Sequence, residues 1–450
     1  MSKRSLLHNA VIVNEGNRFN GYIVIDGETI ADVGQGSPCE AVVASCDSTE
    51  DLNGCLVIPG VIDDQVHFRD PGLTRKGDIS TESRAAVAGG VTSYMDMPNV
   101  VPPTTTLEAL EAKYARAAEV SLANYSFFMG ATNDNIDVLA SSVDYSKTCG
   151  VKAFLGSSTG NMLVNDPKAL HRLFAEVPAL IAVHSEDEAT IAANKARYVA
   201  ERGDDLPVEY HPLIRSAEAC YVSTARAVGM ASQYGTRLHV LHLSTARELS
   251  LFDSTTPLTD KRITAEVCVH HLWFSDEDYS RLGNMIKCNP AIKTVADRDA
   301  LRNALRSGAI DIVATDHAPH LWQEKQGNCL TAASGMPLVQ FSLVAMLELA
   351  RQGVFTIEQV VDKMCHAPAR LYRIDRRGFL RRGYHADIAI IDPASEHKVE
   401  PGNIVSRCGW SPFVGTVFHN RVVRTIVNGN IVYDHGDFYD AHRGQRLLFN

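Results

Sequence analysis

Two residues that can bind ions stand two positions apart near residue 67 of the sequence. A run rich in β-branched residues leads to His67 and Arg69, and Pro71-Gly72 follows them. Residues two apart in a strand share one face, so both side chains point the same way near the end of this strand. An imidazole can bind a metal ion and a guanidinium can bind a carboxylate. Most such pairs are ordinary polar residues at a strand exit, so a functional interpretation depends on partners elsewhere.

Further polar residues follow other strands that the sequence predicts. They are Asn99, Lys152, His184, His242 and Asp316. His317 and His320 follow Asp316 within four positions. Imidazole and carboxylate groups together are typical ligands of zinc or a similar divalent ion. A single buried histidine is more often a hydrogen-bonded core residue than a ligand. The recurrence of such residues at the ends of five strands favours a metal site.

Lys152 is unusual because it interrupts an apolar run, Val151-Lys152-Ala153-Phe154-Leu155. One interpretation is a buried aliphatic stem whose ammonium group reaches water. The other is a lysine that faces a crowded site and loses its charge through desolvation. A neutral amine can add carbon dioxide and become a carbamate, which can bridge two cations as a carboxylate does.

Eight apolar runs of strand length position these side chains. The runs are residues 56–68, 91–97, 125–130, 151–155, 180–184, 238–243, 263–267 and 310–316. Helical stretches separate them, such as residues 106–120, where Leu107, Leu110 and Tyr114 recur at helical spacing. Strands that alternate with helices in this way predict a closed parallel α/β barrel over residues 56–383. Such a barrel carries its active site at the C-terminal ends of the strands.

The two ends of the chain have a different pattern, with short strands and turns. Residues 1–55 and 384–450 are predicted to form the two halves of one small β domain. The predicted strands are residues 10–13, 22–25, 30–33, 386–391, 422–427 and 431–433. Asp26-Gly27 is the hairpin turn between the second and third of these.

Composition excludes several classes of function. The chain has 450 residues and a formal net charge of -10, with no run of basic residues, which argues against binding to nucleic acid or to a membrane surface. No apolar run approaches the length of a membrane span, and the start of the sequence lacks the features of a signal peptide. Ten cysteines without Cys-x-x-Cys spacing fit reduced thiols in the cytoplasm.

Several motifs together resemble the cyclic amidohydrolases, and within them the dihydroorotases. The resemblance extends from about residue 5 to about residue 435. The motifs that carry it are residues 59–72, Met97-Pro98-Asn99, Gly150-Val151-Lys152, Val183-His184-Ser185-Glu186, Leu241-His242-Leu243-Ser244-Thr245 and residues 314–320. The resemblance implies an α/β fold, a TIM-type (β/α)8 barrel of the metal-dependent amidohydrolases with a small β-sandwich domain built from both termini.

The resemblance also implies roles for individual residues. His67 and Asp316 would bind one metal ion, and His184 and His242 a second. The site would hold one or two Zn²⁺ ions per subunit, and a carboxylated Lys152 would bridge the two. Asp316 would also take and return the proton of the attacking water. The residues that would bind the substrate are Arg69, Asn99, Asn289, His320 and Gly335. Glu186 and Glu266 are candidates to orient the ligand histidines, and residues 156–162 form a turn that could cover the substrate.

One position departs from the family pattern. The first barrel strand of these proteins ends in His-x-His, and here Gln65 takes the place of the first histidine. An amide oxygen is a weak, neutral zinc ligand beside imidazole. The site at His67 would then bind metal more weakly, use the Gln65 oxygen or water, or stay empty.

Three hypotheses about function follow. The first is a dihydroorotase of pyrimidine biosynthesis, a cytoplasmic enzyme acting on a small molecule, with a homodimer as the implied assembly. The second is a hydantoinase or allantoinase, against which Arg69 and Asn99 argue. The third is a catalytically silent partner of aspartate transcarbamoylase, for which Gln65 is the only evidence. Five of the six ligand positions of the family have the expected residue here, so an active enzyme is favoured over the silent partner.

Overall fold

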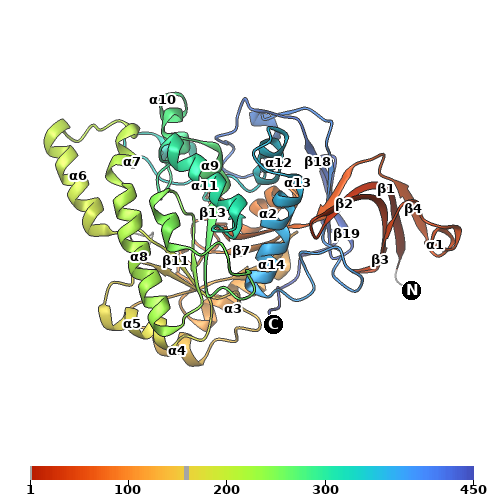
Figure 1. Cartoon of the computed structure of the whole chain (residues 1–450), viewed down its shortest axis with the longest axis horizontal. Coiled ribbons are helices and arrows are strands. Elements are labelled where there is room, and N and C mark those ends of the chain that lie inside the picture. Colours follow the sequence, from red (N-terminus) through yellow and green to blue (C-terminus); the bar gives the residue numbers. More distant parts are fainter. Residues whose placement is uncertain (1–2, 157–161) are drawn as a thin grey trace.

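The computed structural model describes residues 3–156 and 162–450. A barrel surrounded by helices makes up most of the molecule, and a β-rich domain that contains the N-terminal strands lies to one side (Figure 1). Most of the turn predicted at residues 156–162 lies outside the described residues. Among the described residues, no helix is both long and apolar enough to cross a membrane.

The barrel that the sequence predicts is confirmed. Its strands are β6 (Val61–Val66), β7 (Val91–Asp96), β8 (Asn124–Phe127), β9 (Met129–Gly130), β10 (Val151–Phe154), β11 (Ile181–His184), β12 (Leu238–Val240), β13 (Ile263–Cys268) and β14 (Ile312–Ala314). Neighbouring strands pair in parallel in chain order, and β8 and β9 lie on either side of Phe128. A parallel bridge between Val66 and His317 closes the ring from β14 back to β6.

Helices connect the strands and cover the outside of the barrel. They are α2 (Ile79–Ala88), α3 (Leu107–Val120), α4 (Ile136–Ser141), α5 (Pro167–Glu176), α6 (Glu188–Arg202), α7 (His211–Ile214), α8 (Ala217–Tyr234), α9 (Val269–Trp273), α10 (Tyr279–Leu282), α11 (Val295–Ser307), α12 (Ser342–Arg351), α13 (Ile357–Val361) and α14 (Ala367–Tyr372). The helix predicted at residues 106–120 is α3, which begins after Thr106 because the hydroxyl of Thr106 accepts a hydrogen bond from Ala109 N at 3.2 Å.

The terminal β domain contains strands from both ends of the chain, as the sequence predicts. One sheet joins β1 (Arg4–Asn14), β2 (Asn17–Asp26), β3 (Thr29–Gln35), β4 (Ser48–Asp51), β5 (Leu56–Pro59), β15 (Ile388–Asp392), β18 (Arg421–Val427), β19 (Asn430–Asp434) and β20 (Asp437–Phe438). A short helix, α1 (Glu40–Ala44), and a pair of two-residue strands, β16 (His397–Lys398) and β17 (Val417–Phe418), complete the terminal segments. After β20 the chain leaves this sheet, and near its end it runs beside β8, where Leu447 N donates to Tyr125 O at 2.9 Å.

The prediction of one barrel strand over residues 56–68 is wrong. Leu56 and Val57 pair with β1 and β15 in the terminal sheet, and the barrel sheet begins only at Val61. Gly60 separates the two strands and packs against Thr92 so closely that a Cβ would lie 2.0 Å from its hydroxyl oxygen. Both strands are buried along their whole length, so burial does not reveal that they belong to different sheets.

A buried ion pair aligns the ends of β6 and β7, which lead to the candidate site. Lys113 of α3 lies 2.5 Å from Oδ2 of Asp96, and Oδ1 of Asp96 accepts a hydrogen bond from Phe68 N at 2.8 Å. Lys113 also donates to Met97 O at 3.2 Å. Because Phe68 lies between His67 and Arg69, this pair holds the segment that carries both.

We expect Lys113→Met to lower the free energy of unfolding by about 3–5 kcal/mol, because it leaves the Asp96 carboxylate buried without a counterion. Urea unfolding measures this loss. Lys147→Met is the matched control, because Lys147 pairs with Asp144 at the surface with its side chain 53% exposed and such pairs contribute about 1 kcal/mol or less. Equal losses in the two variants would contradict the role of the buried pair.

Candidate active site

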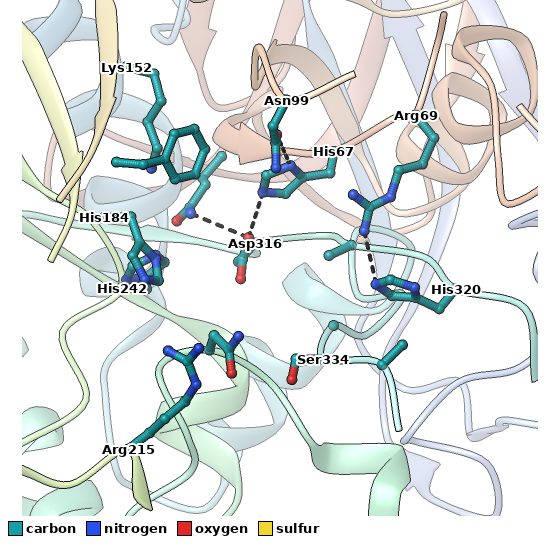
Figure 2. Close-up of a pocket in the computed structure, with 16 residues that line it drawn as sticks. His67, Arg69, Asn99, Lys152, His184, Arg215, His242, Asp316, His320 and Ser334 are labelled. Atoms are coloured by element: carbon teal, nitrogen blue, oxygen red, sulfur yellow. Dashed lines mark hydrogen bonds and ion pairs between the residues drawn. The ribbon is translucent and has the colours of Figure 1, made fainter. Parts of the chain in front are cut away.

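A pocket of about 370 Å³ lies at the C-terminal ends of the barrel strands. Every residue that the sequence predicts to bind metal or substrate lines it (Figure 2). These residues are Gln65, His67, Arg69, Asn99, Lys152, His184, His242, Asn289, Asp316, His320 and Gly335. The structure therefore brings together side chains that lie up to 270 positions apart in the sequence.

His67 and Asp316 form the first pair of candidate metal ligands. His67 Nδ1 lies 2.8 Å from Asn99 Oδ1, which can only accept, so this nitrogen carries the hydrogen. Burial lowers the pKa of His67, so the ring is neutral and its Nε2 has a free lone pair. That Nε2 lies 3.0 Å from Oδ1 of Asp316. Two electron-pair donors thus face each other.

His184 and His242 form the second pair. His184 Nε2 lies 3.0 Å from Oε2 of Glu186, and this contact leaves its Nδ1 free to act as a ligand. Nδ1 in turn lies 3.0 Å from Nε2 of His242. Burial raises the pKa of Glu186, but the charge of Arg215 and the hydrogen bond from His184 outweigh it, so the carboxylate stays ionised.

Lys152 lies in the same wall of the pocket as this second pair (Figure 2). The residue is 1% exposed, and its Nζ lies 4.8 Å from the centre of the Phe154 ring. Burial lowers the pKa of Lys152 to about 7. The neutral amine, which is the form that reacts with carbon dioxide, is therefore well populated at neutral pH.

The donor set fits a divalent metal ion of the zinc type. In each pair the two facing ligand atoms lie 3.0 Å apart, close to the separation of about 3.3 Å between two ligands on one tetrahedral zinc ion. Nδ1 of His242 is buried and has no hydrogen-bond partner among the described residues. Second partners on His67 and His184 orient both rings, as is usual for metal-binding histidines.

Three residues of the site have backbone angles that side chains rarely adopt. The φ angles of Arg69, His242 and Asp316 are 66°, 41° and 48°. Such left-handed conformations cost about 1 kcal/mol or more each and occur mainly where function requires them. Asp63 holds one of them, because its carboxylate accepts hydrogen bonds from both N and Oγ1 of Thr315 at 3.2 and 2.6 Å.

A cationic corner forms the far side of the pocket. Nη2 of Arg69 lies 3.3 Å from His320 Nε2, and Nζ of Lys76 lies 3.0 Å from His320 Nδ1. Burial, Arg69 and Lys76 lower the pKa of His320 far below its usual range, so the ring is neutral. Arg69 is 5% exposed, and no carboxylate of the described residues forms an ion pair with it within 4.0 Å. Lys76 is paired with Oε2 of Glu324 at 3.2 Å, so Arg69 is the cation of this corner that suits an anionic group of a ligand.

Arg215 lines the pocket but was not predicted from the sequence. It follows α7, lies across the pocket from Arg69 and contacts Glu186 Oε2 (Figure 2). Nothing in the local sequence marks it, because its partner lies 29 positions away. Of the two acids expected to orient ligand histidines, Glu186 contacts the His184 ring, whereas Glu266 accepts from the backbone N of His242.

His317 follows Asp316 but points away from the pocket. Its Nε2 lies 2.9 Å from Glu82 Oε2, and its Nδ1 accepts hydrogen bonds from Leu338 N and Val339 N. His317 therefore fixes the loop after β14 rather than contributing to the pocket.

Comparison with known proteins agrees with this geometry. Residues 56–432 match the amidohydrolase family. The dihydroorotase of Methanosarcina acetivorans is 33% identical over 406 residues, which are 87% of this chain and 84% of that protein. The allantoinase of Streptomyces avermitilis is 33% identical over 433 residues, which are 95% of each. The structure of L-hydantoinase (dihydropyrimidinase) from Arthrobacter aurescens superimposes with a TM-score of 0.91 at 25% identity, over all of both chains. The chain therefore belongs to the amidohydrolase family, as a cyclic amidohydrolase.

Proposed function

We propose that the chain is a zinc-dependent dihydroorotase, which interconverts L-dihydroorotate and N-carbamoyl-L-aspartate in the cytoplasmic synthesis of pyrimidines. The observation that carries the proposal is the buried guanidinium of Arg69. A buried charge without a counterion is costly, and a carboxylate of the substrate would compensate it. L-dihydroorotate has such a carboxylate, whereas hydantoin, dihydrouracil and allantoin have none. The similarity to dihydroorotases over most of the chain supports the same choice.

The substrate would lie between the cationic corner and the two pairs of candidate ligands. Arg69 would bind its carboxylate through two parallel hydrogen bonds. Asn99 Oδ1 is already bonded to His67, so its Nδ2 remains to donate to the same carboxylate. The scissile amide would then face His67 and Asp316, and the ring would lie against Asn289 and Gly335 on the adjacent wall.

Bound zinc would lower the pKa of a water molecule and polarise the amide carbonyl. His67, His184, His242, Asp316 and a carboxylated Lys152 would hold it. As water attacks the carbonyl carbon, the Asp316 carboxylate takes its proton. The same proton then passes to the ring nitrogen as the C–N bond breaks, so one group serves as base and acid.

A second candidate, a hydantoinase or allantoinase, has its own support. The L-hydantoinase structure superimposes over the whole chain, and an allantoinase is as similar in sequence as the dihydroorotases. Both would use the same ligands, but neither substrate would pair with Arg69. A silent partner of aspartate transcarbamoylase is the third candidate, for which turnover is the deciding measurement. A homodimer is our proposal for the assembly.

The test is turnover by zinc-loaded protein in the presence of bicarbonate. L-dihydroorotate is offered beside dihydrouracil and allantoin at equal concentration, and N-carbamoyl-L-aspartate is offered for the reverse reaction. Selective turnover of the carboxylated pair is expected. Preferred turnover of dihydrouracil or allantoin would assign the chain to a sister activity, and no turnover by zinc-bound protein would favour the silent partner.

We expect Arg69→Met to raise KM for L-dihydroorotate by about 100-fold, because it removes a charge-assisted hydrogen-bond pair worth about 2.7 kcal/mol. Metal content should stay at the wild-type value, because Arg69 contacts none of the candidate ligands. Steady-state kinetics and elemental analysis measure the two quantities. Arg75→Met, which removes an exposed guanidinium nearby, is the control and should change KM less than twofold. Metal loss with KM unchanged would disprove this role.

A further inference from the structure

The amide of Gln65 makes two hydrogen bonds in the floor of the pocket. Its Nε2 donates to Oδ1 of Asp316 at 3.3 Å, and its Oε1 accepts from the thiol of Cys268 at 3.7 Å. Gln65 is 1% exposed and Cys268 is fully buried. The amide thus lies between the carboxylate at the end of β14 and the thiol at the end of β13.

The Cys268 thiol offers a hydrogen bond to one end of the amide. Burial, reinforced by the charges of Glu266 and Asp316, raises the pKa of Cys268 well above its usual value, so the group keeps its hydrogen and can donate. The thiol also lies 3.7 Å from Oε1 of Glu266, which accepts from His242 N at 3.1 Å and can accept a second hydrogen bond. Within the described part of the chain, Cys268 is the hydrogen-bond donor found for Gln65 Oε1.

The opposite orientation would be unfavourable. Turning the amide over would put its carbonyl oxygen 3.3 Å from a carboxylate oxygen and would remove the hydrogen bond between Cys268 and Gln65 Oε1. Each buried polar group that loses its hydrogen bond in this way keeps its desolvation penalty without compensation. The orientation that offers an N–H, and not an oxygen, to Asp316 is therefore the stable one.

Asp316 is consequently held at one oxygen only. Oδ1 faces both His67 Nε2 and Gln65 Nε2, at 3.0 and 3.3 Å. Oδ2 has no hydrogen-bond partner among the described residues. Asp316 is also the only acidic residue among the described residues that line this pocket. A carboxylate fixed at Oδ1 keeps Oδ2 directed into the pocket, where a proton has to be taken up and released.

We infer that Gln65 is a positioning residue that donates a hydrogen bond to Asp316 and is not a metal ligand, and that Cys268 holds it in this orientation. This inference rests on the acid–base role of Asp316 in the proposed function. It explains how the site tolerates an amide where the family has an imidazole, because the amide has a different task. The first metal position would then depend on His67, Asp316 and the Lys152 bridge alone.

Three substitutions of Gln65 separate a hydrogen-bond donor from a ligand. Gln65→Met has similar length and no polar group, and Gln65→Glu has the same shape with oxygens only. If Gln65 positions Asp316, both variants should lower kcat by 10- to 100-fold, with KM for the substrate and the metal-to-protein ratio within twofold of wild type. Gln65→His should raise the metal-to-protein ratio measured after dialysis against a weak chelator, because it adds an imidazole ligand.

Two substitutions of Cys268 test the anchor independently. Cys268→Ser keeps a hydroxyl donor and should retain kcat within about threefold. Cys268→Ala removes the donor and should lower kcat in the same direction as Gln65→Met, again with normal metal content. This matched pair also decides the question if Gln65→Met does not fold.

Metal content is the deciding measurement. Loss of zinc in Gln65→Met, with retention in Gln65→Glu, would overturn the inference and identify Gln65 as an oxygen ligand. Equal kcat in Cys268→Ala and wild type would overturn the role of Cys268. The kcat and metal content of each variant are compared with those of wild type, using whichever cyclic amide the wild-type protein hydrolyses. Failure of this inference is therefore distinct from a failure of wild type to hydrolyse L-dihydroorotate.

Discussion

Replacing Asp316 with asparagine is expected to lower kcat by about 1,000-fold, in line with the loss of a general base that also serves as general acid. Asp316 provides the only carboxylate among the side chains that line the described pocket, so no neighbour can take over the proton. Asparagine keeps the shape and can still accept from Gln65, so the fold should be preserved. KM should change much less than kcat, because Arg69 and Asn99 remain to bind the substrate.

Kinetics of this variant need a matched control and a metal analysis. Asp144→Asn makes the same chemical change at an exposed position and should leave kcat within twofold. Asp316 is also a candidate ligand, so the zinc content of the variant is measured beside its activity. A kcat within tenfold of wild type at full metal content would exclude Asp316 as the acid–base group, and the proton would then need another carrier.

Much of the fold could be predicted because a barrel strand is buried on both faces. In β14 every residue from Ile312 to Ala314 is apolar and buried, and such continuous apolar runs are recognisable without an alignment. The same property explains the error at residues 56–68, because β5 and β6 are equally buried but belong to different sheets. A hydrophobic pattern predicts that a strand is buried, but it does not predict which strands pair with it.

The candidate site could be predicted to the extent that its residues terminate strands. His67, His184, His242 and Asp316 are polar residues at the ends of apolar runs, and a closed barrel has to bring those ends together. Arg215 could not be found in this way, because it reaches the pocket from a loop and its contact with Glu186 exists only in three dimensions.

The hydrogen bonds of Gln65, like the contact of Arg215 with Glu186, join residues that are distant in the sequence. The sequence suggested a weak ligand or an empty position, whereas the contacts with Asp316 and Cys268 point to a donor. The orientation of an amide depends on neighbours from β13 and β14, more than 200 positions away. Side-chain type at one position therefore predicts what a residue can do, and only its partners select among those possibilities.

Replacing Lys152 with methionine is expected to remove most bound zinc and to lower kcat by about 1,000-fold or more. Methionine fills the same buried space against Phe154 but cannot form a carbamate. Without a bridging carboxylate, two pairs of ligands would remain, and sites with so few ligands bind zinc weakly. Elemental analysis and steady-state kinetics measure the two losses. Lys168→Met, at an exposed position, is the control and should change neither quantity.

Two further measurements connect this loss to carbamate formation. With ¹³C-labelled bicarbonate, a carbamate carbon signal should appear in wild-type protein and be absent from Lys152→Met. Carbon dioxide reacts only with the neutral amine, and burial lowers the pKa of Lys152 to about 7. Zinc loading of metal-free protein in bicarbonate should therefore be faster at pH 8, where the amine is mostly neutral, than at pH 6, where it is mostly protonated. Full zinc content and activity in Lys152→Met would show that the two metal positions need no bridge, and the ligands would then have to include a group other than those proposed.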